Sequence, residues 1–251
     1  MRLDVYLWKN GYAISRNEAK ELIQGGYVSV NGKVIEKPAF ETVEPTEIVV
    51  SREKTPFVSR GGKKLSHALE HFSVEPSGRV CIDVGASSGG FTDCLLQRGA
   101  AHVYAVDSGR DQLVASLRAD PRVSVFEGYN ARYLSLSDFS PSPTLAVMDV
   151  SFISQTLILP SLFDILSPEA ELITLVKPQF ELDRSRLNKR GIVTAENDRQ
   201  LAITRVRTAA VSLGFVDKGL IPSPITGGDG NVEYLLYLQK TTSGHPQGVS
   251  V

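Results

Sequence analysis

The chain has little cysteine, histidine or tryptophan: two, four and one among 251 residues. Cys81 and Cys94 form no CxxC pair, and the histidines lack the spacing of metal ligands. These shortages argue against a disulfide scaffold and a zinc module, so we expect no metal. The chain also lacks the run of ~18 to 20 apolar residues that a transmembrane helix needs. Its N-terminus, MRLDVYLWKNG, carries charges where a signal peptide is apolar. We therefore expect a cytoplasmic protein that requires no membrane.

Charge of one sign does not predominate either. The 27 Lys and Arg balance 28 Asp and Glu, which gives a formal net charge of −1. A uniformly basic surface is thereby excluded, although local basic patches are not. Residues 52–64 contain one such patch, in which Glu53 is outnumbered by five basic residues: Arg52, Lys54, Arg60, Lys63 and Lys64. Pro56 and Gly61-Gly62 within it are typical of a domain boundary, so a solvated linker is its simplest interpretation.

The first fifty residues predict a small α+β unit. Ser15 and Glu18 have the spacing of a helix capping box, and the helical pattern that follows them ends at Gly25-Gly26. Asn31-Gly32 lies between two short β-branched runs, which predicts a hairpin with a type I′ turn. A third strand over 47–51 would complete this unit.

From Arg79 onward, short apolar runs alternate with helical stretches. Continuous apolar runs predict strands that are buried on both faces, and they lie at 80–84, 103–106, 123–126, 145–149 and 172–176. Apolar residues at helical spacing lie between and after them, near 91–95, 113–117, 159–166 and 202–213. This alternation is typical of an α/β protein with a parallel, doubly wound sheet. A last run at 234–238 has no helix after it and predicts an antiparallel addition.

A loop of small residues, Asp83-Val84-Gly85-Ala86-Ser87-Ser88-Gly89-Gly90-Phe91, closes the first buried strand. Small residues let a ligand approach the backbone, and doubly wound sheets bind ligands at this edge. The loop lacks the ending of a P-loop and the GxGxxG of a dinucleotide fingerprint. With its leading acid it resembles the first motif of class I S-adenosylmethionine (SAM) methyltransferases. Asp107 ends the next strand, where it could accept both ribose hydroxyls. A glycine-rich turn without a ligand and nicotinamide binding are the alternatives.

The residues after the fourth and fifth strands bear on which atom receives the methyl group. Met148-Asp149-Val150-Ser151-Phe152 is not the Asn/Asp-Pro-Pro-aromatic tetrapeptide common in enzymes that methylate exocyclic amines. Both cysteines occupy apolar positions, which disfavours a thiolate adduct with a base carbon. A hydroxyl acceptor fits best, because Lys177 ends the fifth strand at the same edge as Asp149. The alternative role of this lysine is an exposed strand cap.

Five segments together are similar to the TlyA family, whose members are called hemolysins and are also ribosomal RNA 2′-O-methyltransferases. The segments are residues 59–65, 83–95, 149–154, 176–181 and 230–234. The resemblance covers Arg2 to about Gln239. It implies a Rossmann-like class I methyltransferase domain of the FtsJ (RrmJ) type and an N-terminal αL module, the RNA-binding type named after ribosomal protein S-four. Together with the basic linker and the polar tail that composition indicates, the division is an RNA-binding domain at 1–51, a linker at 52–63, the methyltransferase domain at 64–240 and a disordered tail at 241–251.

The resemblance also carries over functional residues. The Lys-Asp-Lys-Glu tetrad of FtsJ-type enzymes falls on Lys64, Asp149, Lys177 and Glu233. Lys63 competes with Lys64 for the first position, and the spacing to Leu65 favours Lys64. Family contacts to the cofactor SAM fall on Asp83, Gly85, Ser87, Gly89, Gly90, Phe91, Asp107 and Asn130. Asp229 stands where relatives often carry a basic residue, so no RNA contact is predicted for its loop.

The partner implied is ribosomal RNA or a ribosomal subunit. Contacts to its phosphates are expected from basic residues of the N-terminal module and the linker: Arg2, Arg16, Lys20, Lys33 and Arg60. We therefore expect SAM-dependent methylation of ribose 2′-hydroxyls. An RNA-binding assembly factor without methyl transfer remains an alternative. A hemolysin-like, membrane-active protein is a weaker one, because it needs an amphipathic or spanning segment that the sequence does not offer. A small-molecule O-methyltransferase would leave the N-terminal module unexplained.

Overall fold

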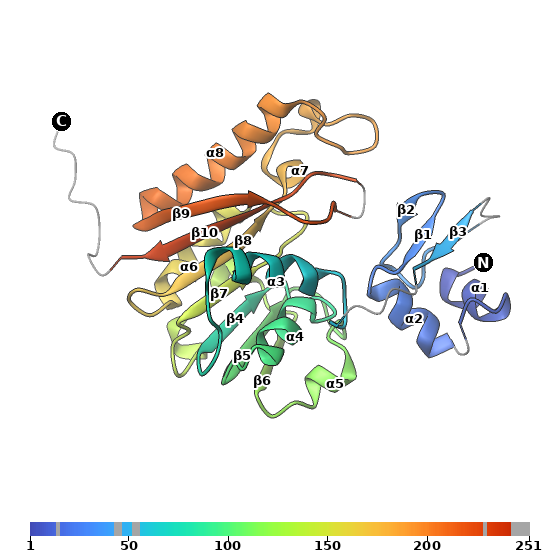
Figure 1. Ribbon diagram of the computed structural model, residues 1–251, viewed down its shortest axis with the longest axis horizontal. Helices are drawn as coiled ribbons and strands as arrows, with labels where there is room; N and C mark the ends of the chain where they lie inside the picture. Colours follow the sequence, from blue (N-terminus) through green and yellow to red (C-terminus); the bar gives the residue numbers. More distant parts are fainter. Residues whose placement is uncertain (14–15, 43–46, 52–55, 228–229, 242–251) are drawn as a thin grey trace.

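The computed structural model describes residues 1–13, 16–42, 47–51, 56–227 and 230–241, without the side chains of Asn17, Glu18 and Glu21. Figure 1 shows a small N-terminal body beside a larger one that holds the main sheet. Several predictions lie outside the described residues. They are the capping box of Ser15 and Glu18, the basic side chains of Arg52 and Lys54, the position of Asp229, and the tail beyond Thr241.

The small body is the predicted α+β unit, which we call the N-terminal module (residues 1–51). Its helices and strands are α1 (Leu3–Lys9), α2 (Arg16–Gln24), β1 (Val28–Val30), β2 (Lys33–Val34) and β3 (Ile48–Val50). Both neighbours of the central strand β1 are antiparallel to it. Asn31 and Gly32 have φ angles of 51° and 75°, which confirms the type I′ turn. Helix α1 was not predicted. Its Leu3 and Leu7 pack with Ile23 of α2 in a hydrophobic core formed by residues of the N-terminal module.

The large body contains a seven-stranded sheet in the order β6-β5-β4-β7-β8-β10-β9. Its strands are β4 (Val80–Val84), β5 (His102–Asp107), β6 (Val123–Glu127), β7 (Leu145–Met148), β8 (Glu171–Val176), β9 (Phe215–Pro222) and β10 (Tyr234–Lys240). The first five are parallel, as predicted from their continuous apolar runs. Strand β10 is antiparallel to β8, which confirms the predicted addition. Strand β9 was missed, because this edge strand interrupts its apolar residues with Asp217, Lys218 and Gly219.

Helices cover both faces of this sheet (Figure 1). They are α3 (Gly61–Phe72), α4 (Gly90–Gln97), α5 (Ala115–Arg118), α6 (Leu159–Ile165), α7 (Pro178–Glu181) and α8 (Glu196–Leu213), with 3₁₀ turns η1 (Ala131–Tyr133), η2 (Leu136–Asp138), η3 (Gln155–Leu157) and η4 (Arg184–Arg186). One core joins the sheet to α3, α4 and α5 through residues such as Leu65 and Leu95. The other joins it to α6 and α8 through Leu162 and Val206. The result is the three-layer doubly wound architecture.

Both cysteines, Cys81 on β4 and Cys94 on α4, belong to the core that joins the sheet to α3 and α4. Burial raises the pKa of Cys81 and that of Cys94 to about 12, so neither thiol supplies a thiolate near neutrality. Among the described residues, no helix has the length and apolar character to cross a bilayer. The same residues contain no group of three or more His, Cys, Asp or Glu side chains that could hold a metal ion.

Candidate active site

Four charged side chains meet where β7 and β8 end and β10 begins. Asp149 directly follows β7, and Lys177 directly follows β8. Glu233 directly precedes β10, and Tyr234 pairs with Val176, so the register brings Glu233 across from Lys177. Lys64 comes from the first turn of α3. The four residues that the resemblance implied as a tetrad are therefore brought together from four separate segments.

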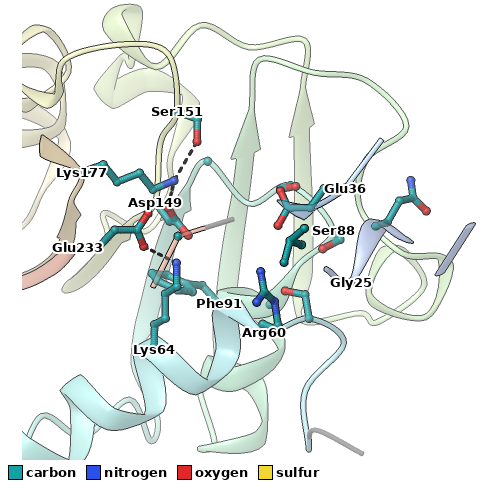
Figure 2. A pocket seen from close by; sticks show the side chains of 18 of the residues that line it. Gly25, Glu36, Arg60, Lys64, Ser88, Phe91, Asp149, Ser151, Lys177 and Glu233 are labelled. Carbon is teal, nitrogen blue, oxygen red and sulfur yellow. Dashed lines mark hydrogen bonds and ion pairs between the residues drawn. The ribbon is translucent and has the colours of Figure 1, made fainter. Parts of the chain in front are cut away.

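Two short ion pairs organise these groups (Figure 2). Nζ of Lys64 lies 2.6 Å from Oε2 of Glu233, and Nζ of Lys177 lies 2.6 Å from Oδ1 of Asp149. Lys64, Lys177 and Glu233 are each less than a tenth exposed. Lysine and glutamate are almost never buried without a partner, so pairing is what allows both lysines to stay here. Lys177 is a buried group of the site, which contradicts its alternative role as an exposed cap.

The charges of this cluster shift each other's pKa values. Burial alone would lower the pKa of Lys177, but the negative charges of Asp149 and Glu233 outweigh it and raise that pKa above its ordinary value. Burial opposes ionisation of Asp149 as well, yet Lys177 and Lys64 hold the pKa of Asp149 below its ordinary value. Both members of this pair are therefore charged near neutrality, with Lys177 as an ammonium.

Ser151 is a further member of the cluster. Nζ of Lys177 donates a hydrogen bond to Oγ of Ser151 at 2.8 Å. The loop that carries Ser151 is anchored by Glu181, which accepts hydrogen bonds from the Ser154 hydroxyl and the Gln155 amide. Sequence reasoning missed this role, although Ser151 lies inside a segment that carried the family resemblance. Its contact to Lys177 depends on how the loop returns towards β8, which spacing alone does not reveal.

A cavity of about 700 Å³ opens above the four charged groups. Gly85, Ser87, Gly90 and Phe91 of the predicted cofactor loop line it. The volume is within the range of sites that hold a small organic ligand, and the small residues leave backbone atoms accessible. The residues present therefore fit a nucleoside-sized cofactor.

Two predicted cofactor residues lie behind the loop instead of in the cavity lining. Asp83 is completely buried and accepts a hydrogen bond from the Thr92 hydroxyl at 2.6 Å. Burial raises the pKa of Asp83 to about 7. Gly89 has a φ of 101°, and a β-carbon there would lie 2.3 Å from a methyl carbon of Leu117. Both residues shape the loop: Asp83 supports it from below, and Gly89 allows its close packing on α5.

Asp107 and Asn130 extend this site along the sheet edge but also lie outside the cavity lining. The Asp107 carboxylate accepts hydrogen bonds from the amides of Ser87 and Gly109, at 2.8 and 2.7 Å. It thereby ties the glycine-rich loop to the next loop. Asn130 is exposed, and its side chain accepts a hydrogen bond from the Arg132 amide at the start of η1.

The basic residues predicted to bind RNA are placed differently from one another. Arg2 and Arg16 both form ion pairs with the buried Asp4, at 3.0 and 2.9 Å. Lys20 is half-buried on α2, whereas Lys33 is exposed and lines the cavity. Arg60 is half-buried between the N-terminal module and the cofactor loop rather than on an open surface.

The mouth of the cavity carries an aromatic pair. Phe152 is 90% exposed, and its ring centroid lies 5.1 Å from that of Phe180. Nζ of Lys177 lies 6.0 Å from the Phe180 ring centroid. An apolar ring this exposed at the rim of a polar cavity is typical of a contact surface for a planar ligand.

Comparison with known proteins bears on both bodies. Residues 57–240 match the family model of FtsJ-like methyltransferases, and residues 1–44 match that of the S4 domain. The chain is 43% identical to the 16S/23S rRNA (cytidine-2′-O)-methyltransferase TlyA of Mycobacterium tuberculosis, over 96% of this chain and 90% of the relative.

Two solved structures are similar as well. A structure from Streptococcus thermophilus described as a candidate hemolysin is 44% identical, covers 98% of this chain and 90% of its own, and has a TM-score of 0.77. A SAM-dependent methyltransferase structure from Listeria monocytogenes is 14% identical with a TM-score of 0.55, and covers 72% of this chain and 98% of its own. At that identity the likeness concerns the fold alone.

Proposed function

The chain belongs to the FtsJ-like methyltransferase family, and from this membership we propose that it transfers the methyl group of SAM to ribose 2′-hydroxyls of ribosomal RNA. The observation that carries the proposal is the pairing of two buried lysines with two acids at one edge of a 700 Å³ cavity. The named activity of the Mycobacterium tuberculosis relative supports the choice of acceptor. The N-terminal S4 match supports an RNA substrate over a small molecule.

Bound SAM supplies an electrophilic methyl group on a sulfonium sulfur. The residues that line the cavity and would hold it are Gly85, Ser87, Gly90 and Phe91, with Asp107 at its ribose and Asn130 at its adenine. Asp83 and Gly89 contribute indirectly, by fixing the shape of the loop. This assignment of residues is part of the proposal.

Lys177 is the proposed base for the ribose hydroxyl. As a neutral amine its Nζ accepts the hydroxyl proton, and Asp149 and Ser151 hold that nitrogen in place. A positioned base contributes roughly 10²- to 10⁴-fold in rate. In the free protein the pKa of Lys177 is raised, so the amine form must be made accessible on binding. A positive ligand nearby and exclusion of water from the cavity both lower a lysine pKa.

Lys64 and Glu233 form the second pair of the site. Their contact at 2.6 Å fixes α3 against the start of β10. The Lys64 ammonium stands near the reacting oxygen in this proposal, where it stabilises negative charge that develops as the hydroxyl loses its proton. The tetrad thus divides into a base with its orienting acid and a stabilising cation with its own acid.

We propose that the N-terminal module binds ribosomal RNA, or a ribosomal subunit, with basic residues that include Arg2, Arg16, Lys20 and Lys33. The domain limits given above, at 51/52 and 63/64, belong to this proposal; the matched ranges are 1–44 and 57–240, and the second includes residues 57–63 of the predicted linker. No membrane or metal enters the proposed reaction, and its compartment is that of ribosomal RNA, the cytoplasm.

The test is methyl transfer from labelled SAM to 16S and 23S rRNA from a strain without this gene, followed by mapping of 2′-O-methylated nucleotides. We expect one or a few ribose positions to be labelled by the full chain, and none by Lys177→Ala. Lys218→Ala, on the exposed edge strand β9, is the control that should keep activity. Labelling of a base instead of a ribose, or full activity of Lys177→Ala, would contradict the proposal. Leakage from liposomes without RNA methylation would favour the membrane-active alternative.

A further inference from the structure

The cavity is not built by the methyltransferase domain alone. The N-terminal module lines one side of it with residues from the end of α2 and the segment after the hairpin, including Gly25, Glu36 and Phe40. Figure 2 shows Glu36 and Arg60 beside Ser88 of the cofactor loop, on the side of the cavity away from the tetrad. A second charged pair therefore faces the same space as the proposed catalytic groups.

Glu36 and Arg60 approach each other across Gly26. A β-carbon on Gly26 would lie 2.8 Å from Nε of Arg60 and 3.3 Å from Oε1 of Glu36. The Arg60 amide donates a hydrogen bond to the carbonyl oxygen of Gly25 at 3.4 Å, which ties the segment before α3 to the N-terminal module. Among the described residues, Nε of Arg60 is buried and has no hydrogen-bond partner. An arginine donor left unsatisfied in this way is costly. Because Nε itself is packed on Gly26, a ligand in the cavity would contact the terminal nitrogens of the guanidinium instead.

The carboxylate of Glu36 also faces the cavity. It is accessible from the cavity, but the surrounding protein desolvates it and raises its pKa, even though Arg60, Lys177 and Lys64 oppose this shift. A further cation arriving in the cavity would stabilise its charged form.

The chemistry of SAM matches these two groups. Its sulfonium carries three substituents: the methyl group, the adenosyl group and an α-amino acid chain with one carboxylate and one ammonium. In the proposed function the methyl group faces Lys177 and the adenosyl group faces Asp107. The third substituent, the α-amino acid chain, then extends towards the side of the cavity where Arg60 and Glu36 lie.

Resting on the proposed function, we propose that Arg60 and Glu36 form the binding site for the α-amino acid end of SAM. Arg60 takes the carboxylate, for which its fork of N–H donors is suited, and Glu36 takes the ammonium. Because Glu36 belongs to the N-terminal module, the module that binds RNA also completes the cofactor site. Movement of that module relative to the methyltransferase domain then changes SAM affinity.

The test compares two ligands that differ only beyond the thioether sulfur. S-adenosylhomocysteine carries the α-amino acid end, whereas 5′-methylthioadenosine has a methyl group there. Their dissociation constants are measured by titration calorimetry on the full chain and on Glu36→Gln, Glu36→Ala and Arg60→Lys. Glu47→Gln, an exposed carboxylate of the same module outside the cavity lining, is the matched control.

Glu36→Gln should weaken S-adenosylhomocysteine binding about 10-fold, as expected for loss of a charged hydrogen bond. Its affinity for 5′-methylthioadenosine should stay within about twofold, which also verifies that the cavity is intact. Unchanged S-adenosylhomocysteine affinity in both Glu36 variants overturns the inference, even if RNA turnover falls, because Glu36 would then act on RNA. An equal loss of affinity for both ligands also overturns the inference. If the unmodified chain binds neither ligand and labels no RNA, both this inference and the proposed function fail.

Discussion

Glu233 and Lys177 each lie one residue beyond the Tyr234–Val176 pair of β10 and β8, yet the Glu233 carboxylate accepts a hydrogen bond from Lys64. Lys177 instead contacts Asp149 and Ser151. Each lysine therefore has its own acid, and the influence of Glu233 on Lys177 is electrostatic over a longer distance. This arrangement separates the charge of Glu233 from the orientation of the proposed base, so the two effects can be tested independently.

Replacing Glu233 by glutamine should move the pH dependence of methyl transfer to lower pH. The charge of Glu233 raises the pKa of Lys177, so its removal lowers that pKa and makes the neutral amine available at lower pH. We therefore expect the midpoint of the single-turnover rate against pH to move to lower pH. The maximal rate should fall as well, since Lys64 loses its partner. Glu75→Gln, which changes an exposed carboxylate outside the cavity lining, should leave the midpoint unchanged. An unmoved midpoint in Glu233→Gln would remove Lys177 as the titrating base.

The parallel sheet and the tetrad could be predicted from the sequence, for two different reasons. Strands buried on both faces have continuous apolar runs, and each run from 80–84 to 172–176 became a strand. The tetrad followed from segments that resemble a known family. The direction of the Lys177 pKa shift was beyond reach, because it depends on distances to Asp149 and Glu233 that only the folded chain sets.

Other features carried no local signal. Helix α3 was not predicted, although its buried residues Leu65, Ala68 and Leu69 have helical spacing, because glycines and charges at 59–64 indicated a linker. Glu36 resembles any exposed glutamate in the sequence. Its position depends on how the N-terminal module docks beside Arg60, a contact between residues distant in the chain.

Truncation of Phe152 to alanine should weaken the use of RNA without affecting the cofactor. Its ring is exposed at the cavity mouth and packs against Phe180, where an unpaired base could stack on it. Stacking on an aromatic ring is worth roughly 1 to 3 kcal/mol per base, so we expect about a 10-fold or larger rise in KM for RNA. S-adenosylhomocysteine affinity should be unchanged. Leu157→Ala, another exposed apolar residue outside the cavity lining, should behave like the unmodified protein. A normal KM in Phe152→Ala would show that the ring makes no contact with RNA.

Glu127→Gln should destabilise the protein at neutral pH but not in acid. Its carboxylate accepts hydrogen bonds from the amides of Asp111, Gln112 and Leu113 and pairs with Arg118. Although partial burial opposes this shift, these partners lower the pKa of Glu127 from 4.5 to about 2. The stabilisation is therefore complete above about pH 4.5 and is lost as pH falls towards 2.

Urea unfolding at several pH values measures this effect. We expect Glu127→Gln to lower the free energy of unfolding by about 1 to 3 kcal/mol at pH 7, and the difference from the unmodified protein to shrink below pH 4. Because Glu127 holds the loop after Asp107, cofactor affinity should decrease too. A constant difference across the whole pH range would mean that packing, rather than the charge of Glu127, stabilises this loop.

The contribution of the N-terminal module to RNA binding can be measured through salt dependence. Each phosphate contact by a lysine adds about 0.7 to 0.9 to the slope of log K against log salt concentration. Arg2 and Arg16 are poor first targets, since both pair with the buried Asp4, which would be left uncompensated. Lys20 and Lys33 carry no such complication with Asp4. The double variant Lys20→Gln/Lys33→Gln should therefore bind a ribosomal RNA fragment more weakly and reduce the slope by about 1.4 to 1.8.

Fluorescence anisotropy over a range of potassium chloride concentrations gives both quantities at once. Lys218→Gln removes a lysine from the exposed strand β9, away from the N-terminal module, and should leave the slope unchanged. Weaker binding with an unaltered slope would mean that the two lysines support the module's structure and do not contact phosphate. A reduced slope in the double variant alone would place the phosphate contacts on α2 and the hairpin. The RNA would then lie along the same module that presents Glu36 to the cavity, so one body would contact both substrate and cofactor.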